Sequence, residues 1–137
     1  MPIKIISNGE SALLVDDHPD VLVSVGAFLE AAGFDVVRAR SGDEALACLG
    51  SGQKFRLLVT DYAMPGLDGA DLAKQAVELL PGLKVLIITG YPSDAGLFDR
   101  PPSVALLAKP FRRAALIAML QSMFATGQTN LPTSAPD

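Results

Sequence analysis

The chain has 137 residues, which fits one domain with a single substantial core. Half of its residues are hydrophobic, its net charge is −4 and its basic residues are scattered, so the composition excludes a disordered chain and gives no electrostatic footprint for nucleic acid. A single cysteine excludes an internal disulfide and a cysteine-based zinc site. The lack of a signal-peptide core or a membrane-length apolar run predicts a cytoplasmic protein.

Five apolar runs alternate with amphipathic segments after a short lead-in over residues 1–10. The runs are short, aliphatic and bounded by turn residues, which predicts buried strands of a parallel sheet. We expect these strands over residues 11–16, 35–40, 55–60, 84–89 and 104–108. Helical spacing of apolar residues predicts helices over 20–32, between Ser41 and Gly50, over 70–80 and over 112–125. This alternation favours a doubly wound α/β domain over 11–125, followed by a tail over 126–137 that we expect to be disordered.

Local signals refine two parts of this organisation. Ser41 is a good N-cap, and Glu44, three residues later, completes the pattern of a capping box. Residues 90–103 contain three prolines and Gly96, so they have room for only a short or irregular helix. The fourth helix region is therefore expected to be atypical.

Acidic residues and one lysine follow three of the predicted strands. Asp16 and Asp17 close the first strand, Asp61 closes the third, and Lys109 follows the fifth. Because the carboxyl ends of the strands in an open α/β sheet meet at one crevice, we expect these side chains to lie close together. Three carboxylates beside one ammonium carry excess negative charge, which a hard divalent cation such as Mg²⁺ would relieve. This pattern suggests chemistry on a phosphoryl group.

Four motifs at these strand ends resemble the receiver domain of two-component response regulators. They are Asp16-Asp17, the run from Val59 to Gly69, Ile88-Thr89-Gly90-Tyr91, and Lys109-Pro110-Phe111, in the order and approximate spacing of that family. The resemblance covers roughly residues 11–125. It implies a flavodoxin-like (CheY-like) doubly wound sheet of five parallel strands in the order 2-1-3-4-5. It also implies a cis peptide bond between Lys109 and Pro110.

The resemblance implies that Asp61 is the phosphoacceptor. A carboxylate can attack a phosphoryl group to give an acyl phosphate, which agrees with this role, whereas a loop or helix-capping aspartate is the structural alternative. By the same resemblance, Asp17 and Asp61 ligate Mg²⁺ directly and Asp16 acts through metal-bound water. The backbone carbonyl of Ala63 supplies a further oxygen to the metal. A solvated acidic turn is the alternative for Asp16 and Asp17.

Thr89 and Lys109 complete the site that the resemblance implies. The Thr89 hydroxyl would donate a hydrogen bond to a phosphoryl oxygen, although threonine is common at strand ends without a function. Lys109 would supply a point charge to the phosphoryl group and balance the acidic cluster when it is empty. His18, the sole histidine, is expected to be solvated and to have no catalytic role. The phosphodonor is therefore expected to be a partner, either a histidine kinase or a histidine phosphotransfer protein.

One position departs from the family pattern. Many receivers carry an aromatic residue three positions before the lysine, where this chain has Leu106, so the usual coupling of threonine to an aromatic ring is in doubt. We hypothesise that Tyr91 instead covers the phosphoryl site and restricts attacking water. Because Ala63 offers no polar side chain to orient that water, this hypothesis predicts a long-lived phosphoaspartate.

The last predicted helix has a wide apolar face that could bind a partner protein. One apolar stripe consists of Leu116, Met119, Leu120 and Met123, and a second consists of Ile117 and Phe124. This wide apolar face has two interpretations, a broad core contact or a docking patch with adaptable methionines. Receivers commonly signal through the fourth helix, fifth strand and fifth helix. The docking interpretation would therefore place a homodimer contact or a partner protein on that face.

We therefore expect a phosphorylation-controlled switch of protein–protein interactions, and not a metabolic enzyme, with no nucleic-acid or membrane partner. The chain would be a stand-alone regulator or the receiver of a larger protein such as a hybrid kinase. A phosphoaspartyl hydrolase of the haloacid-dehalogenase type is a different class, but it needs a second acid two residues after the nucleophile, where this chain has Ala63. A docking module that keeps only the fold is a third class, against which the intact acids, Thr89 and Lys109 argue.

Overall fold

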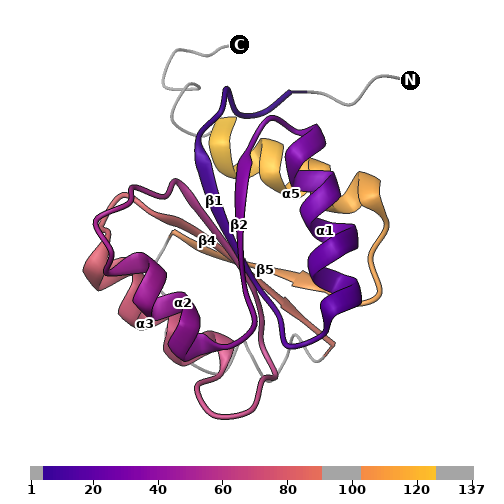
Figure 1. Cartoon of the computed structure of the whole chain (residues 1–137). Coiled ribbons are helices and arrows are strands. Elements are labelled where there is room, and N and C mark those ends of the chain that lie inside the picture. Colours follow the sequence, from indigo (N-terminus) through magenta and orange to yellow (C-terminus); the bar gives the residue numbers. More distant parts are fainter. Residues whose placement is uncertain (1–4, 91–102, 126–137) are drawn as a thin grey trace.

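A computed structural model of the chain describes residues 5–90 and 103–125 (Figure 1). Five parallel strands form one sheet in the order β2-β1-β3-β4-β5, which confirms the predicted fold class and strand order. The strands are β1 (Ser11–Val15), β2 (Asp35–Ala39), β3 (Leu57–Asp61), β4 (Lys84–Thr89) and β5 (Val104–Ala108). The helices of the described part are α1 (Pro19–Ala31), α2 (Gly42–Leu49), α3 (Gly69–Leu79) and α5 (Arg113–Ala125).

The observed elements begin and end within two residues of the predicted ones. The largest difference is β3, which begins at Leu57 and includes Asp61 as its last residue, paired in register with Ile88 of β4. The backbone of Asp61 is thus fixed by the sheet. The predicted atypical fourth helix, Tyr91 and the tail over 126–137 lie outside the described residues.

The helices cover the two faces of the sheet in pairs, with α1 and α5 on one face and α2 and α3 on the other (Figure 1). Successive side chains of a strand point to opposite faces. Leu13 and Val15 of β1 therefore join the core cluster under α2 and α3, while Ala12 and Leu14 join the cluster under α1 and α5. Continuous apolar strands are required because both faces of this sheet are covered.

Side-chain caps begin two of the helices. The Ser41 hydroxyl accepts a hydrogen bond from the backbone N–H of Glu44 at 3.1 Å, as the capping box predicts. The Glu44 carboxylate accepts from the backbone N–H of Arg40 at 2.8 Å, one residue before the expected partner. Asp68 caps α3, where its carboxylate accepts from the backbone N–H of Asp71 at 2.8 Å.

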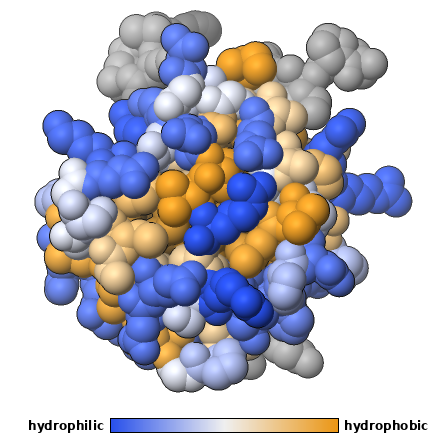
Figure 2. Space-filling view, in the orientation of Figure 1, coloured by the Kyte–Doolittle hydropathy of each residue, from blue (hydrophilic) through white to orange (hydrophobic). Residues whose placement is uncertain are grey.

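The edge strand β2 carries charged side chains. Figure 2 shows this side of the molecule, where strongly hydrophilic side chains lie between hydrophobic ones. Asp35 and Arg38 of β2 are exposed, and the Arg38 guanidinium reaches α1, donating from Nε to the Leu22 carbonyl at 2.9 Å. Charged residues on an edge strand oppose pairing with the edge of another sheet.

Residues 5–10 of the lead-in are hydrogen-bonded to the turn between α1 and β2. The backbone N–H groups of Ile6 and Ser7 both donate to the Ala32 carbonyl, at 2.8 and 3.0 Å, and Gly9 donates to Gly33 at 2.8 Å. Gly33 has a φ of +103°, and a Cβ there would collide with the carbonyl oxygen of Ser7. This close approach requires glycine. Residues 1–4 lie outside the described residues.

Both apolar stripes of α5 pack against the core. Leu116 and Leu120 are fully buried, and the partly buried side chains of Ile117, Met119, Met123 and Phe124 contact the same cluster. Phe124 also packs against Phe34, with ring centroids 5.6 Å apart. These contacts support the interpretation of the wide apolar face as a broad core contact. No helix in the described part of the chain is long and apolar enough to cross a membrane.

Candidate functional site

The predicted site residues meet at the carboxyl ends of the strands. Asp61 and Thr89 are the last residues of the neighbouring strands β3 and β4, and both are buried. Asp16 follows β1 and is buried as well, while Lys109 follows β5 and its backbone N–H donates to the Thr89 carbonyl at 2.8 Å. The parallel order of the sheet therefore brings residues distant in sequence to one place. The Lys109–Pro110 peptide bond is cis, as the resemblance implies.

Asp61 and Lys109 form an ion pair at this edge. Lys109 Nζ lies 2.7 Å from Asp61 Oδ1, and the Asp61 side chain is 4% exposed. Burial raises the pKa of Asp61, the Lys109 ammonium lowers it, and the charges of Asp16 and Asp17 raise it; the net direction is upward. The carboxylate is therefore destabilised by its surroundings and only partly compensated by one cation.

Asp16, Asp17 and His18 form a second charged group beside this pair. His18 Nδ1 lies 3.0 Å from Asp16 Oδ1 and 3.3 Å from Asp17 Oδ1. The backbone N–H of His18 also donates to Asp16 Oδ1, at 2.9 Å. The hydrogen bond to Asp16 and the charge of Asp17 raise the pKa of His18. The ring is largely exposed, as the sequence predicts, but its contact with both acids was not predicted.

Pro19 is the sequence signal for the contact between His18 and the two acids. Proline restricts the residue before it to an extended conformation, and His18 has φ −99° and ψ 116°. Pro19 is also the first residue of α1, so His18 occupies the N-cap position, although its side chain makes no capping hydrogen bond. The run Asp16-Asp17-His18-Pro19 thus restrains the backbone of His18 beside the acids.

The acidic residues fit a divalent cation. Asp17 Oδ1 is buried and makes no hydrogen bond with any described residue, which is costly for a carboxylate oxygen. Asp16, Asp17 and His18 each offer a ligand atom, and these atoms lie within 4.8 Å of one another. A cation bound there would satisfy the free oxygen and reduce repulsion between the carboxylates. Ala63 is exposed two residues beyond β3, on the loop that leads to α3.

The β3–α3 loop is packed closely against the backbone of Asp61. The N–H of Gly69 donates to the Tyr62 carbonyl at 2.8 Å, and the N–H of Tyr62 donates to Ile88 at 2.8 Å. A Cβ on Gly69 would collide with the carbonyl oxygen of Asp61. Gly69 therefore supports the position of Asp61, a role that the sequence analysis did not assign.

Of the two residues predicted to modulate the site, the structure describes Leu106 but not Tyr91. Leu106 of β5 is half-buried and packs against the core cluster under α2 and α3, opposite Ile87 in register. A leucine therefore occupies the position where many receivers carry an aromatic ring. Tyr91 lies outside the described residues, so its covering role stays a prediction.

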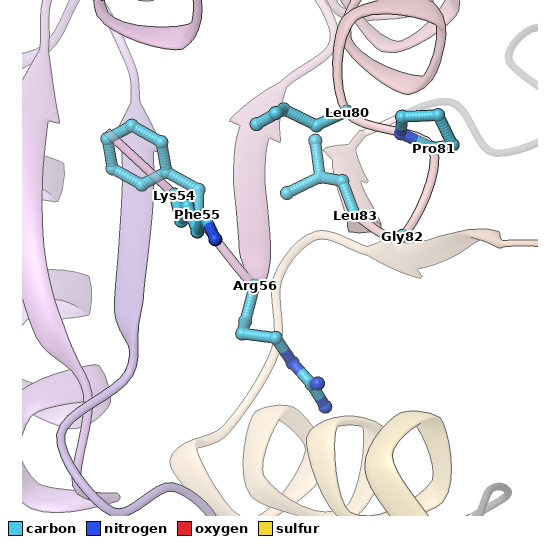
Figure 3. A pocket seen from close by; sticks show the side chains of 7 residues that line it. All are labelled: Lys54, Phe55, Arg56, Leu80, Pro81, Gly82 and Leu83. Carbon is cyan, nitrogen blue, oxygen red and sulfur yellow. The ribbon is translucent and has the colours of Figure 1, made fainter. Parts of the chain in front are cut away.

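A cavity of about 320 Å³ lies away from this site (Figure 3). It is lined by residues 54–56, which precede β3, and 80–83, which precede β4, so it lies at the amino ends of the strands. The Arg56 side chain points away from Leu80 and Leu83 in Figure 3. It pairs instead with Glu10 at 3.3 Å and lies over the ring of Phe124. We therefore assign the candidate site to the carboxyl ends alone.

Comparison with known proteins agrees with this geometry. The family model described as "Response regulator receiver domain" matches residues 12–121. The chain therefore belongs to the response regulator receiver domain family. Among its relatives, the response regulator receiver protein CpdR of Brucella abortus is 35% identical over 113 residues, which cover 81% of this chain and 93% of CpdR.

Two further comparisons concern a longer relative and a solved structure. The sensor kinase CckA of Brucella abortus is 30% identical over 121 residues, 86% of this chain but only 13% of CckA. The crystal structure of a CheY-like response regulator receiver domain protein from Methanospirillum hungatei JF-1 has a TM-score of 0.77 at 27% identity. That match covers 89% of this chain and 98% of the other.

Family membership defines the class of function. The chain is a two-component receiver that accepts a phosphoryl group, and it works as a signalling switch. Receiver domains bind Mg²⁺ at an acidic pocket and interact with histidine kinases or phosphotransfer proteins.

Proposed function

We propose that Asp61 is the residue that accepts the phosphoryl group. The observation that carries this proposal is the buried carboxylate at the end of β3, with Lys109 Nζ 2.7 Å away. An Asp61 oxygen would attack the phosphorus of a phosphohistidine donor. The P–O bond forms as the P–N bond breaks, and the donor imidazole keeps the electron pair of that bond. The product is an acyl phosphate on Asp61.

Lys109 and Thr89 would stabilise the phosphorylated state. The Lys109 ammonium is already at hydrogen-bond distance from Asp61 and half-exposed, so it can turn from the carboxylate to a phosphoryl oxygen while keeping an anionic partner. Thr89 ends the adjacent strand β4, from which its hydroxyl would donate to another phosphoryl oxygen. Phosphorylation would then change the interactions of these two side chains, because both would bind phosphoryl oxygens.

Mg²⁺ would be held by Asp17, Asp61 and the backbone carbonyl of Ala63, with Asp16 acting through water. The buried Asp17 Oδ1, which makes no hydrogen bond with a described residue, supports this assignment. When bound, the ion would neutralise charge on the transferring phosphoryl group. Asp16 is hydrogen-bonded to the His18 backbone and so keeps its carboxylate aimed at the site.

Incubation with acetyl phosphate, followed by intact mass measurement, tests the assignment of Asp61. We expect wild-type protein with Mg²⁺ to gain one phosphoryl group and Asp61→Asn to gain none. Asp43→Asn, at an exposed position in the first turn of α2, is the matched control and should be phosphorylated like wild type. Equal phosphorylation of Asp61→Asn would contradict the proposal.

We further propose that this protein is cytoplasmic and that a histidine kinase or a histidine phosphotransfer protein supplies its phosphoryl group. Phosphorylation would then change how this receiver binds other proteins. A homodimer or partner contact through the face that contains β5 and α5 remains part of this proposal. Residues 91–102, which belong to that face in the sequence prediction, lie outside the described residues.

The lifetime of the phosphoryl group is a separate proposal, drawn from the sequence. If Tyr91 covers the phosphoryl site, the phosphoaspartate of Tyr91→Ala should hydrolyse faster than that of wild type, while that of Tyr91→Phe, which keeps the ring, should hydrolyse at the wild-type rate. Loss of phosphoprotein after removal of the phosphodonor measures the rate. An unchanged rate in Tyr91→Ala would rule out the shielding role.

A further inference from the structure

His18 faces the proposed metal site and has no assigned role there. Its Nδ1 atom lies 3.0 Å from Asp16 Oδ1 and 3.3 Å from Asp17 Oδ1, although the imidazole ring is 66% exposed. An exposed ring is free to turn toward solvent, yet this nitrogen is directed at both acids. Asp17 Oδ1, the oxygen that it faces at 3.3 Å, makes no hydrogen bond with a described residue.

The separation of His18 Nδ1 from Asp17 Oδ1 fits two ligands of one ion. Atoms bound at neighbouring positions of an octahedral ion, with bonds of about 2.1 Å, lie about 3 Å apart. The 3.3 Å between His18 Nδ1 and Asp17 Oδ1 is close to this value. Asp16 Oδ1, which would act through metal-bound water, lies 3.0 Å from the same nitrogen. An ion bound to Asp17 could therefore take His18 Nδ1 as a neighbouring ligand.

The backbone holds His18 in place before any ion binds. Pro19 restricts it to an extended conformation, and its own N–H donates to Asp16 Oδ1 at 2.9 Å. A ligand that is already positioned loses little conformational freedom on binding. His18 is therefore better placed to coordinate than an exposed side chain on a free loop.

We propose that His18 Nδ1 is a ligand in this site and raises its preference for first-row transition ions such as Ni²⁺ over Mg²⁺. This inference rests on the proposed function, because it concerns the same metal site. Mg²⁺ prefers oxygen ligands, whereas imidazole nitrogen suits ions such as Fe²⁺, Ni²⁺, Cu²⁺ and Zn²⁺. The His18 ring would thus shift the preference of an otherwise oxygen-rich site.

Pulsed electron paramagnetic resonance of bound Mn²⁺ tests this directly, because the chain has one histidine. We expect a nitrogen coupling of the strength of a directly bound imidazole, which changes isotope pattern when histidine is labelled with ¹⁵N. In His18→Phe, which keeps a ring without nitrogen, the coupling should disappear. The ratio of Ni²⁺ to Mg²⁺ affinity, measured by calorimetry, should fall by about tenfold or more in His18→Phe.

The contrary result is equally specific. In the metal-free protein a hydrogen bond between His18 and Asp16 accounts for the same distance, and an ion that displaces the ring would give Mn²⁺ binding with no imidazole coupling. That outcome overturns the inference. An equal loss of affinity for Ni²⁺ and Mg²⁺ in His18→Phe overturns it as well. Circular dichroism and thermal melting of His18→Phe establish that the variant is folded.

The same experiment separates this inference from the proposed function. If wild-type Asp61 is phosphorylated with Mg²⁺ but Mn²⁺ shows no imidazole coupling, the role of His18 is wrong and that of Asp61 stands. If the coupling is present but Asp61 is not phosphorylated with either ion, His18 is a ligand and the phosphoacceptor assignment is wrong.

Discussion

At the scale of single residues, the site depends on a carboxylate in an unfavourable place. The Asp61 side chain is 4% exposed and its pKa is raised, chiefly by burial, even though Lys109 lies 2.7 Å away. A raised pKa means that the folded protein binds the Asp61 proton more tightly than the unfolded chain does. The contribution of Asp61 to the stability of the metal-free protein should therefore fall as the pH rises from about 3.8, the ordinary pKa of an aspartate, through the folded pKa.

Asp61→Asn should remove this loss of stability. In buffer with a chelator, we expect the melting temperature of Asp61→Asn to exceed that of wild type at neutral pH by a few degrees, the shift that about 1 kcal/mol produces. The difference should shrink as the pH falls through the folded pKa, because protonated Asp61 carries no buried charge. Thermal melts across this pH range measure the difference in melting temperature. A difference that is independent of pH would show that the buried charge of Asp61 is not its cause.

The residues that end the strands could be predicted from sequence, because each follows an apolar run and parallel strands share one carboxyl edge. This logic places Asp16, Asp61, Thr89 and Lys109 correctly at that edge. It could not place the His18 ring, since the pattern of strands says nothing about the rotamer of a loop residue. The restriction imposed by Pro19 is the one local signal for that contact.

At the scale of elements, the β3–α3 loop links Asp61 to α3. Gly69 approaches the Asp61 carbonyl so closely that a Cβ would collide with it. Asp68, one residue earlier, caps the helix, so the loop has little freedom to move aside. The position of the proposed phosphoacceptor therefore depends on a residue that has no side chain.

Gly69→Ala should both destabilise the protein and impair phosphorylation. We expect a loss of about 2 kcal/mol in the free energy of unfolding, as for other overpacked sites, and slower uptake from acetyl phosphate. Gly82→Ala, in the turn before β4, is the control because its Cβ would meet open space. Urea denaturation and intact mass provide the two measurements. If Gly69→Ala matched Gly82→Ala in both, the supporting role of the loop would be wrong.

The element boundaries were predictable to within two residues because strong turn and cap signals surround each run. The details of the caps were less predictable. Glu44 bonds to the N–H of Arg40 instead of that of Ser41, since a long carboxylate can reach either donor in the first turn. The attachment of residues 5–10 depends on backbone bonds to Ala32 and Gly33, which leave no periodic signal in the sequence.

At the scale of the whole molecule, α5 closes the core on one face of the sheet. Its two apolar stripes contact one core cluster. The Phe124 ring packs against the Phe34 ring, and the Arg56 guanidinium lies 5.5 Å from the Phe124 ring centroid. The sequence alone left a docking patch as the alternative, because periodicity records how wide an apolar face is but not what covers it.

Phe124→Ala tests that assignment. If the ring belongs to the core, we expect a loss of about 2 kcal/mol in the free energy of unfolding, below the cost of a fully buried phenylalanine. Ala118→Ser, at an exposed position of the same helix, is the control and should change stability little. Unchanged stability of Phe124→Ala would favour the docking interpretation instead.

The central claim is that this receiver accepts its phosphoryl group on Asp61. The most direct measurement is reduction of the phosphorylated protein with borohydride, which converts the acyl phosphate into a stable alcohol, followed by tandem mass spectrometry of its peptides. We predict that the reduced side chain is at Asp61, with Asp16 and Asp17 unmodified. Reduction at another aspartate, or at none in a protein that has gained the phosphoryl mass, would contradict the claim.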